Sequence, residues 1–212
     1  MSHASCLVAL TDDELGEHGS VQAAIEFQML PFDENGEWFK KGSRWDWWQV
    51  GGRYGGRLLG RDHARRRELV EDVLKVYQRK RAHETWLEFE KELGRNGDSA
   101  LVRSLYDFGP DETADTLAEK YEARLLTAFA FLRQRRWHEA ERMGWWGGSA
   151  QTECEIDHGP DYKGKCLHTS KELNARIISW AEDWDKWASR FWQRFVKPLD
   201  PDTHLVMVDY HV

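Results

Sequence analysis

The sequence predicts an α+β protein built on a ferredoxin-like antiparallel sheet, with helices on one face and a helical insertion. Short apolar or alternating runs typical of strands open the chain, recur as a pair after its middle, and close it. Amphipathic helical stretches lie between these runs. With residues 60–120 set aside as the insertion, the order is β–α–β–β–α–β, which is that of a ferredoxin-like sandwich. The predicted strands span residues 5–11, 125–132, 137–141 and 203–211, and the two helices span residues 21–30 and 169–197.

The first half of this pattern has clear boundary signals. Residues 5–11 form an apolar run that predicts a buried first strand. Ser20 is an N-cap for the helix at residues 21–30, and Pro31 ends that helix. Residues 60–120 are laced with charges at helical spacing, which predicts helices packed as an antiparallel pair.

The second half is equally well marked. Residues 125–132 are the strongest strand signal, and a polar turn leads from them into the alternating strand at 137–141. Residues 169–172 form a capping box that starts the last helix. Its apolar stripe is predicted to face the core. The stripe comprises Ile177, Trp180, Ala181, Trp184, Trp187, Ala188, Phe191 and Phe195.

Length and composition restrict the class of protein. The 212 residues suit a single domain, with residues 1–59 and 121–212 as the sheet core and 60–120 as the insertion. A net charge of −7 argues against a general binder of duplex nucleic acid. No apolar run reaches membrane-spanning length and no secretion signal is evident. Three cysteines without a Cys-x-x-Cys pair are typical of reduced thiols. We therefore expect a cytoplasmic protein.

Residues 43–57 are the most informative segment, because they combine three tryptophans with two glycine pairs and two arginines. Indole rings can stack on a flat ligand, arginines can hold phosphate or carboxylate, and glycines allow close approach of the backbone. The alternative is a tryptophan-rich turn that fills a small core. A second aromatic–glycine cluster contains Trp145 and Trp146. The predicted ligand-binding residues are Trp45, Asp46, Trp47, Trp48, Gly51, Gly52, Arg53, Tyr54, Arg57, Trp145 and Trp146.

The last strand supplies candidate catalytic residues. Asp209 and His211 are two residues apart, so they point to the same face of a strand. His138 comes from another predicted strand, and Asp46 and Arg53 arrive from the loop after the first helix. An acid–base histidine, an orienting carboxylate and an anion-holding arginine are what hydrolysis of a phosphodiester needs. The alternative is that these side chains are simply solvated.

Positive charge is concentrated in residues 53–81, which hold many more bases than acids. Such a run is most often the solvated face of a helix. It could also draw an anion toward the glycine–arginine loop that precedes it, or support self-association into a homo-oligomer.

The segment Trp45 to Gly56 resembles the Trp-Asp-Trp-Tyr-x-Ile-Gly-Gly-Arg-Trp-x-Gly signature of a family of small phage and bacterial proteins, mostly of unknown function. Residues 137–147, containing Gly-Trp-Trp-Gly, and the closing Val-Asp-Tyr-His of residues 208–211 are similar to further parts of that family, as is the turn at residues 31–35. The resemblance does not cover residues 60–120 or 149–170. Its phage setting implies one function, a counter-defence protein that sequesters or cleaves a bacterial immune signalling nucleotide.

Two other segments contain residues that could form a functional site, but their patterns are less specific than that of residues 43–57. Cys154, His158, Cys166 and His168 could ligate zinc, but their spacing is not a common finger pattern, so we predict no metal and no cofactor. The triplets His3-Ala-Ser5 and His168-Thr-Ser170 superficially suggest a two-histidine phosphoesterase. Those enzymes place both triplets in paired strands, whereas here one is expected in a ragged N-terminus and the other at a helix cap.

The sequence therefore predicts a protein that binds a nucleotide or another small anionic, phosphate-bearing ligand. Whether it cleaves that ligand depends on His138, Asp209 and His211. The alternative is a protein–protein interaction module that inhibits a host enzyme through its tryptophan and arginine surface, since Trp and Arg are typical of interface hot spots.

Overall fold

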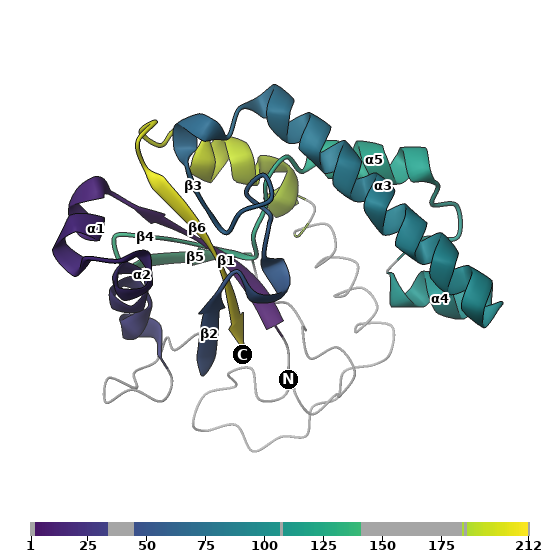
Figure 1. Cartoon of the computed structure of the whole chain (residues 1–212), viewed down its shortest axis with the longest axis horizontal. Helices are drawn as coiled ribbons and strands as arrows, with labels where there is room; N and C mark the ends of the chain where they lie inside the picture. The colour runs from purple at the N-terminus through teal and green to yellow at the C-terminus, as the bar shows by residue number, and fades with distance from the viewer. Residues whose placement is uncertain (1–2, 34–44, 107, 141–183, 185, 212) are drawn as a thin grey trace, which may run out of the picture.

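The structure is a computed structural model that describes residues 3–33, 45–106, 108–140, 184 and 186–211. Within these residues a mixed α/β fold is organised around a six-stranded, mostly antiparallel sheet (Figure 1). The strands are β1 (His3–Leu10), β2 (Trp47–Val50), β3 (His63–Arg65), β4 (Ala130–Arg133), β5 (Arg136–Glu139) and β6 (His204–His211).

The two long strands β1 and β6 form the centre of the sheet. They pair antiparallel over their whole length, from His3 opposite His211 to Leu10 opposite His204. The first and last strands are therefore neighbours, as predicted, and the two chain ends lie together at one end of the sheet (Figure 1). Both β2 and β3 pair with the outer side of β6, while β4 and then β5 continue the sheet beyond β1.

The strand order corrects the ferredoxin-like prediction. A ferredoxin-like sandwich is a split βαβ unit, in which another strand separates the two parallel strands. Here β4 pairs directly with β1, and in parallel, and β5 lies at the sheet edge. The reason is visible in the side chains: Phe131 packs in one core while Ala130 and Leu132 pack in the other, so β4 is apolar on both faces. The more polar β5 suits an edge.

Helices cover both faces of the sheet, whereas the sequence predicted helices on one face only. On one face, α2 (Val21–Met29) packs Ala24, Ile25 and Met29 against Val8 and Val206. On the other, α3 (Glu71–Asn96) and the helical segment near the C-terminus pack against Leu7 and Met207. Alternate residues of β1 and β6 serve the two cores, because successive side chains of a strand point to opposite faces.

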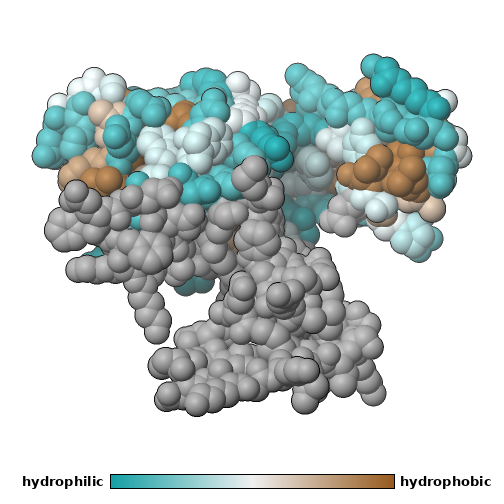
Figure 2. Space-filling view, turned by 90° about the horizontal axis from the view of Figure 1, so that it is seen from below, coloured by the Kyte–Doolittle hydropathy of each residue, from teal (hydrophilic) through white to brown (hydrophobic). Residues whose placement is uncertain are grey.

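The helical insertion is present. Its helices are α3, α4 (Ser99–Leu105) and α5 (Ala114–Ala123), and α5 packs along α3 as an arm beside the sheet (Figure 1). Its first residues differ from the prediction, because β3 at residues 63–65 joins the sheet. Figure 2 shows an apolar patch over α4 and the neighbouring part of α3, where Leu87, Leu101 and Leu105 are exposed.

The remaining elements are short. Helix α1 (Asp12–His18) was not predicted; it begins at a capping box formed by Thr11 and Glu14. The N-cap role of Ser20 is confirmed, since its side chain accepts a hydrogen bond from the Ala23 amide. The last helix is described at residues 186–196 and ends in a π-helical turn, and its Trp187, Phe191 and Phe195 pack in the core as predicted. Single 3-10 turns span Leu30–Phe32, Gly52–Tyr54 and Arg66–Glu68.

Candidate functional site

The glycine-rich part of the motif is a loop that interrupts the edge of the sheet. Strands β2 and β3 pair with successive parts of β6, and residues 51–62 leave the sheet between them. Met207 of β6 holds both ends of this loop. Its carbonyl accepts from the Gly51 amide at 2.8 Å, and its amide donates to the Asp62 carbonyl at 2.8 Å.

The glycines of this loop surround two carboxylates of the protein itself. A Cβ on Gly51 would collide with the Asp62 carboxylate, and the Gly56 amide donates to the same carboxylate at 2.7 Å. A Cβ on Gly52 would lie 2.5 Å from Oδ2 of Asp209. Both Gly51 and Gly52 have positive φ, which favours glycine. The glycines were predicted to let the backbone approach an anionic ligand. In the structure they let the backbone approach the carboxylates of Asp62 and Asp209 instead.

Asp209 positions His3. Its side chain is only 2% exposed, and a buried carboxylate needs hydrogen-bond donors. One oxygen contacts Nδ1 of His3 at 2.9 Å, and the other accepts from the Arg53 amide at 3.0 Å. Because a carboxylate only accepts, the neutral form of the His3 ring carries its proton on Nδ1 and has its lone pair on Nε2.

Asp46 positions His211 in the same way. Oδ1 of Asp46 lies 2.5 Å from Nδ1 of His211, and the Asp46 amide donates to the His211 carbonyl at 3.2 Å. The His211 side chain is 10% exposed. Among the described residues its Nε2 has no hydrogen-bond partner although the atom is buried. Buried polar atoms are nearly always paired, so an unpartnered one among polar side chains points to a ligand or a chemical role.

The two imidazoles lie side by side. His3 and His211 are directly opposite in the β1–β6 register, and their ring centroids are 5.4 Å apart. Asp209 is two residues from His211, so its side chain is on the same face. We call His3, Asp46, Asp209 and His211 the histidine site. The predicted convergence of Asp46 with Asp209 and His211 is thus observed.

The rest of the motif frames this site. Trp47 pairs with His211 across the β2–β6 ladder, meets the His3 ring edge-on at 5.9 Å, and is 44% exposed. The Tyr54 hydroxyl donates to the His3 carbonyl at 2.9 Å. Burial raises the pKa of Tyr54, and the nearby Asp209 adds to this rise, so the hydroxyl keeps its proton. The Arg53 guanidinium is exposed and forms no ion pair within the described residues.

Two of the predicted stacking residues instead belong to the core. Trp45 is 7% exposed and its indole N–H donates to the Met29 carbonyl at 3.2 Å. Trp48 pairs with Tyr210, whose side chain faces the α2 core, and packs there itself. Alternation along β2 explains the outcome, because Trp47 and Trp48 must point to opposite faces. Trp47 alone of the three is placed to stack on a ligand.

His138 is remote from the histidine site. It lies on β5, opposite Phe131 of β4, and is therefore two strands, or about 10 Å, from β1. The β1 residue at that level is Leu7, which is four residues, or about 13 Å, from His3. The His138 ring instead neighbours Phe195 at 5.6 Å. The predicted catalytic role of His138 is not supported by its position. Trp145, Trp146 and the cluster of Cys154, His158, Cys166 and His168 lie outside the described residues.

His3 is the residue that sequence reasoning missed. It was expected in a ragged N-terminus, but it is the first residue of β1, a central strand. The period-two alternation of His3 and Ser5 ahead of Leu7 was the signal that could have found it. The reason for setting aside the first His-x-Ser triplet was therefore wrong, while His168 of the second lies outside the described residues.

The described residues contain no group of three or more His, Cys, Asp or Glu side chains arranged to hold a metal ion. In the same part of the chain, no helix is both long and apolar enough to cross a membrane. Comparison of the chain with protein-family models, with curated proteins and with solved structures finds no match. The function is therefore inferred from the geometry of the site.

Proposed function

We propose that the protein binds a nucleotide or another phosphate-bearing small molecule at the histidine site and cleaves a phosphodiester bond in it. One observation carries this proposal: two imidazoles, each held at Nδ1 by its own aspartate, lie 5.4 Å apart on neighbouring strands. Two positioned imidazoles can supply the general base and the general acid of one reaction. A solely structural role for both pairs would not account for the unpartnered Nε2 of His211 within the described residues.

The chemistry needs only water as co-reactant. One neutral imidazole accepts a proton from the water that attacks phosphorus through its oxygen. The other imidazole, protonated, gives its proton to the leaving oxygen as the bond from phosphorus to that oxygen breaks. The products are a phosphate monoester and an alcohol, and the two histidines exchange protons with solvent before the next turnover. The aspartates stabilise whichever imidazole is charged.

Trp47 and Arg53 supply the recognition groups beside the histidines. The exposed indole of Trp47 offers a face for a base, and base–aromatic stacking contributes about 1–3 kcal/mol. The Arg53 guanidinium offers paired donors for phosphate. The backbone of Arg53 is fixed by the hydrogen bond from its amide to Asp209. The carboxylate of Asp209 therefore positions both the proposed phosphate-binding residue Arg53 and the proposed catalytic residue His3.

The resemblance to phage proteins suggests which nucleotides to test first. We propose bacterial signalling nucleotides, cyclic mononucleotides and cyclic dinucleotides above all, as the substrate class. The experiment is to incubate such a panel with untagged protein and to separate the products by chromatography. We expect His3→Ala and His211→Ala each to slow cleavage by about 100-fold to 10,000-fold. His83→Ala is the matched control, because His83 is an exposed histidine on α3.

The outcomes separate binding from cleavage. Full activity in either active-site variant would overturn the catalytic role. If wild type leaves every nucleotide intact, yet one of them quenches the tryptophan fluorescence of the protein, the protein sequesters that nucleotide and does not cleave it. Trp47→Phe and Arg53→Ala are expected to reduce that quench, because Trp47 is the exposed tryptophan of the described residues.

The second candidate function is a protein–protein interaction module. The observation that favours it is the apolar patch around Leu101 and Leu105, at 52% and 65% exposed (Figure 2). A host protein retained by wild type and lost with Leu105→Asp, with no response to any nucleotide, would favour this alternative over the histidine site.

A further inference from the structure

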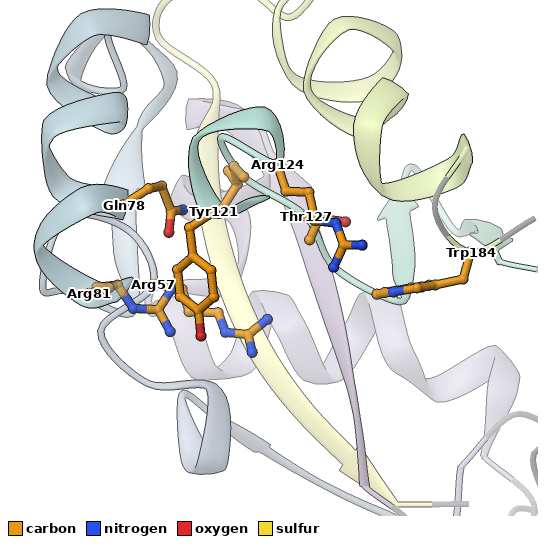
Figure 3. Close-up of a pocket in the computed structure, with 8 residues that line it drawn as sticks. Arg57, Gln78, Arg81, Tyr121, Arg124, Thr127 and Trp184 are labelled. Carbon is orange, nitrogen blue, oxygen red and sulfur yellow. The ribbon is translucent and has the colours of Figure 1, made fainter. Parts of the chain in front are cut away.

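A cavity of about 190 Å³ lies between the helical arm and the sheet, and three arginines from separate parts of the chain line it. Arg57 comes from the loop after β2, Arg81 from α3, and Arg124 follows the last turn of α5. Figure 3 shows the side chains of Arg57 and Arg81 converging beside the ring of Tyr121, with Trp184 at the far side of the cavity. We call this the arginine cavity.

The charges of Arg57 and Arg81 are not neutralised by acidic neighbours within the described residues. There, neither arginine forms an ion pair, and none of the residues that line the cavity is acidic. Arg79, two residues before Arg81 on the same helix, is by contrast paired with Glu122. Burial, and then repulsion by Arg81, lower the pKa of Arg57 to about 10, which still leaves it charged at neutral pH. The protein has a net charge of −7, yet positively charged side chains are concentrated at the arginine cavity.

The other polar groups of the cavity are mostly donors. Tyr121 contributes a hydroxyl beside the two guanidinium groups (Figure 3). Thr127 also lines the cavity, and its buried Oγ1 has no hydrogen-bond partner among the described residues. The buried Gln78 amide is already used, since it donates to the Leu125 carbonyl at 2.5 Å. Guanidinium forks with hydroxyl donors and no carboxylate are suited to an oxyanion.

We propose that the arginine cavity binds a phosphoryl group of a small molecule. This role is inferred from the geometry of the cavity alone. The connection between the cavity and the histidine site indicates, in addition, the class of substrate that would occupy both. The Arg57 guanidinium lies 4.6 Å from the centre of the Tyr54 ring, and the Tyr54 hydroxyl bonds to the His3 carbonyl. One tyrosine side chain thus links the two sites. This second step rests on the proposed function: the substrate carries a second phosphate, as a dinucleotide or a nucleoside polyphosphate does.

Calorimetric titration with inorganic pyrophosphate tests the cavity directly. Wild type should bind pyrophosphate more tightly than adenosine, which carries no phosphate. Arg81→Gln should weaken binding by about 10-fold to 100-fold, the usual loss when one charge-assisted hydrogen bond is removed. Arg79→Gln removes the same charge from the same helix outside the cavity, and should change the affinity by less than about threefold, since surface charges are screened. Tighter binding of adenosine diphosphate than of pyrophosphate would identify a nucleotide as the source of the phosphoryl group.

Three results would overturn the cavity proposal: no pyrophosphate binding at millimolar concentration, equal losses in Arg79→Gln and Arg81→Gln, or undiminished binding in Arg81→Gln. Arg57→Gln provides a second variant, with its melting temperature measured alongside to confirm folding. His211→Ala separates this proposal from the proposed function. Pyrophosphate binding by both wild type and His211→Ala without any nucleotide cleavage would support the cavity and refute catalysis, whereas cleavage without pyrophosphate binding would do the reverse.

Discussion

Replacing Gly52 by alanine tests how the motif loop holds Asp209. Gly52 has φ of +54°, and a Cβ there would lie 2.5 Å from Oδ2 and 2.6 Å from Cβ of Asp209. The Cβ of Asp209 cannot swing away, because it is fixed to β6 at the centre of the sheet. The left-handed backbone costs an alanine about 1–2 kcal/mol. The collision adds about 1–3 kcal/mol, the usual cost of overpacking. We expect Gly52→Ala to lower the free energy of unfolding by about 2–5 kcal/mol.

Gly60→Ala is the matched control for this substitution. Gly60 belongs to the same loop and has φ of +85°, but no heavy atom lies within 4 Å of the position that a Cβ would take there. It should therefore show the backbone cost alone, about 1–2 kcal/mol. Urea unfolding of both variants, followed by circular dichroism, measures the difference. Equal losses of stability in the two variants would refute the inferred contact between Gly52 and Asp209.

Three further substitutions test the fold. Thr11→Ala removes the capping box of α1 and should cost about 1 kcal/mol of unfolding free energy in urea titrations; an unchanged midpoint would contradict the cap. Leu7→Ala, in the central strand and fully buried, should cost about 2–5 kcal/mol by the same measurement, and a loss below about 1 kcal/mol would show that the site is not tightly packed. Burial, and then the charge of His204, lower the pKa of His63 from 6.5, so the unfolded chain takes up a proton before the folded one and stability falls as the pH drops below about 6.5. His63→Gln should flatten this decline between about pH 7.5 and 5.5, and a slope identical to that of wild type would exclude His63 as its source.

Local patterns predicted most elements because their physical causes are local. The strand predicted at residues 203–211, the helix predicted from the N-cap at Ser20 and the core-facing stripe predicted through Phe191 are each confirmed. The pairing of the first and last strands also followed, since element order restricts which strands can be neighbours. The start of β1 was missed because two polar residues, His3 and Ser5, precede its apolar run.

Strand neighbours and helix faces depend on long-range packing, and the prediction was wrong there. The hairpin of β4 and β5 could join β1 through either strand, and the apolar character of β4 on both faces decided the choice. Helices were predicted on one face because residues 60–120 were treated as a separate insertion. In the structure Leu74 of α3 packs against the sheet and helps to form the second core.

The candidate site, too, was predictable only where local sequence patterns determine it. Asp209 and His211 could be placed on one face from their spacing, and Asp46 from the motif. The function of the glycines could not be predicted, because Asp62 and Asp209 reach them only through the folded loop. The arginine cavity was likewise hidden. Only Arg57 of its three arginines belongs to the motif, while Arg81 and Arg124 meet it because the helices of the insertion turn back toward the sheet.

Nitrogen-detected NMR of the imidazole rings of His3 and His211, with His83 as an exposed reference, is the decisive measurement for the histidine site. We predict that Nδ1 carries a proton in both rings, held by Asp209 in His3 and by Asp46 in His211. Addition of a bound nucleotide should shift Nε2 of both rings and leave His83 unchanged. An Nδ1 without a proton in either ring of the free protein, or no response of either ring to a nucleotide that binds, would show that the two aspartate–histidine pairs do not form a nucleotide site.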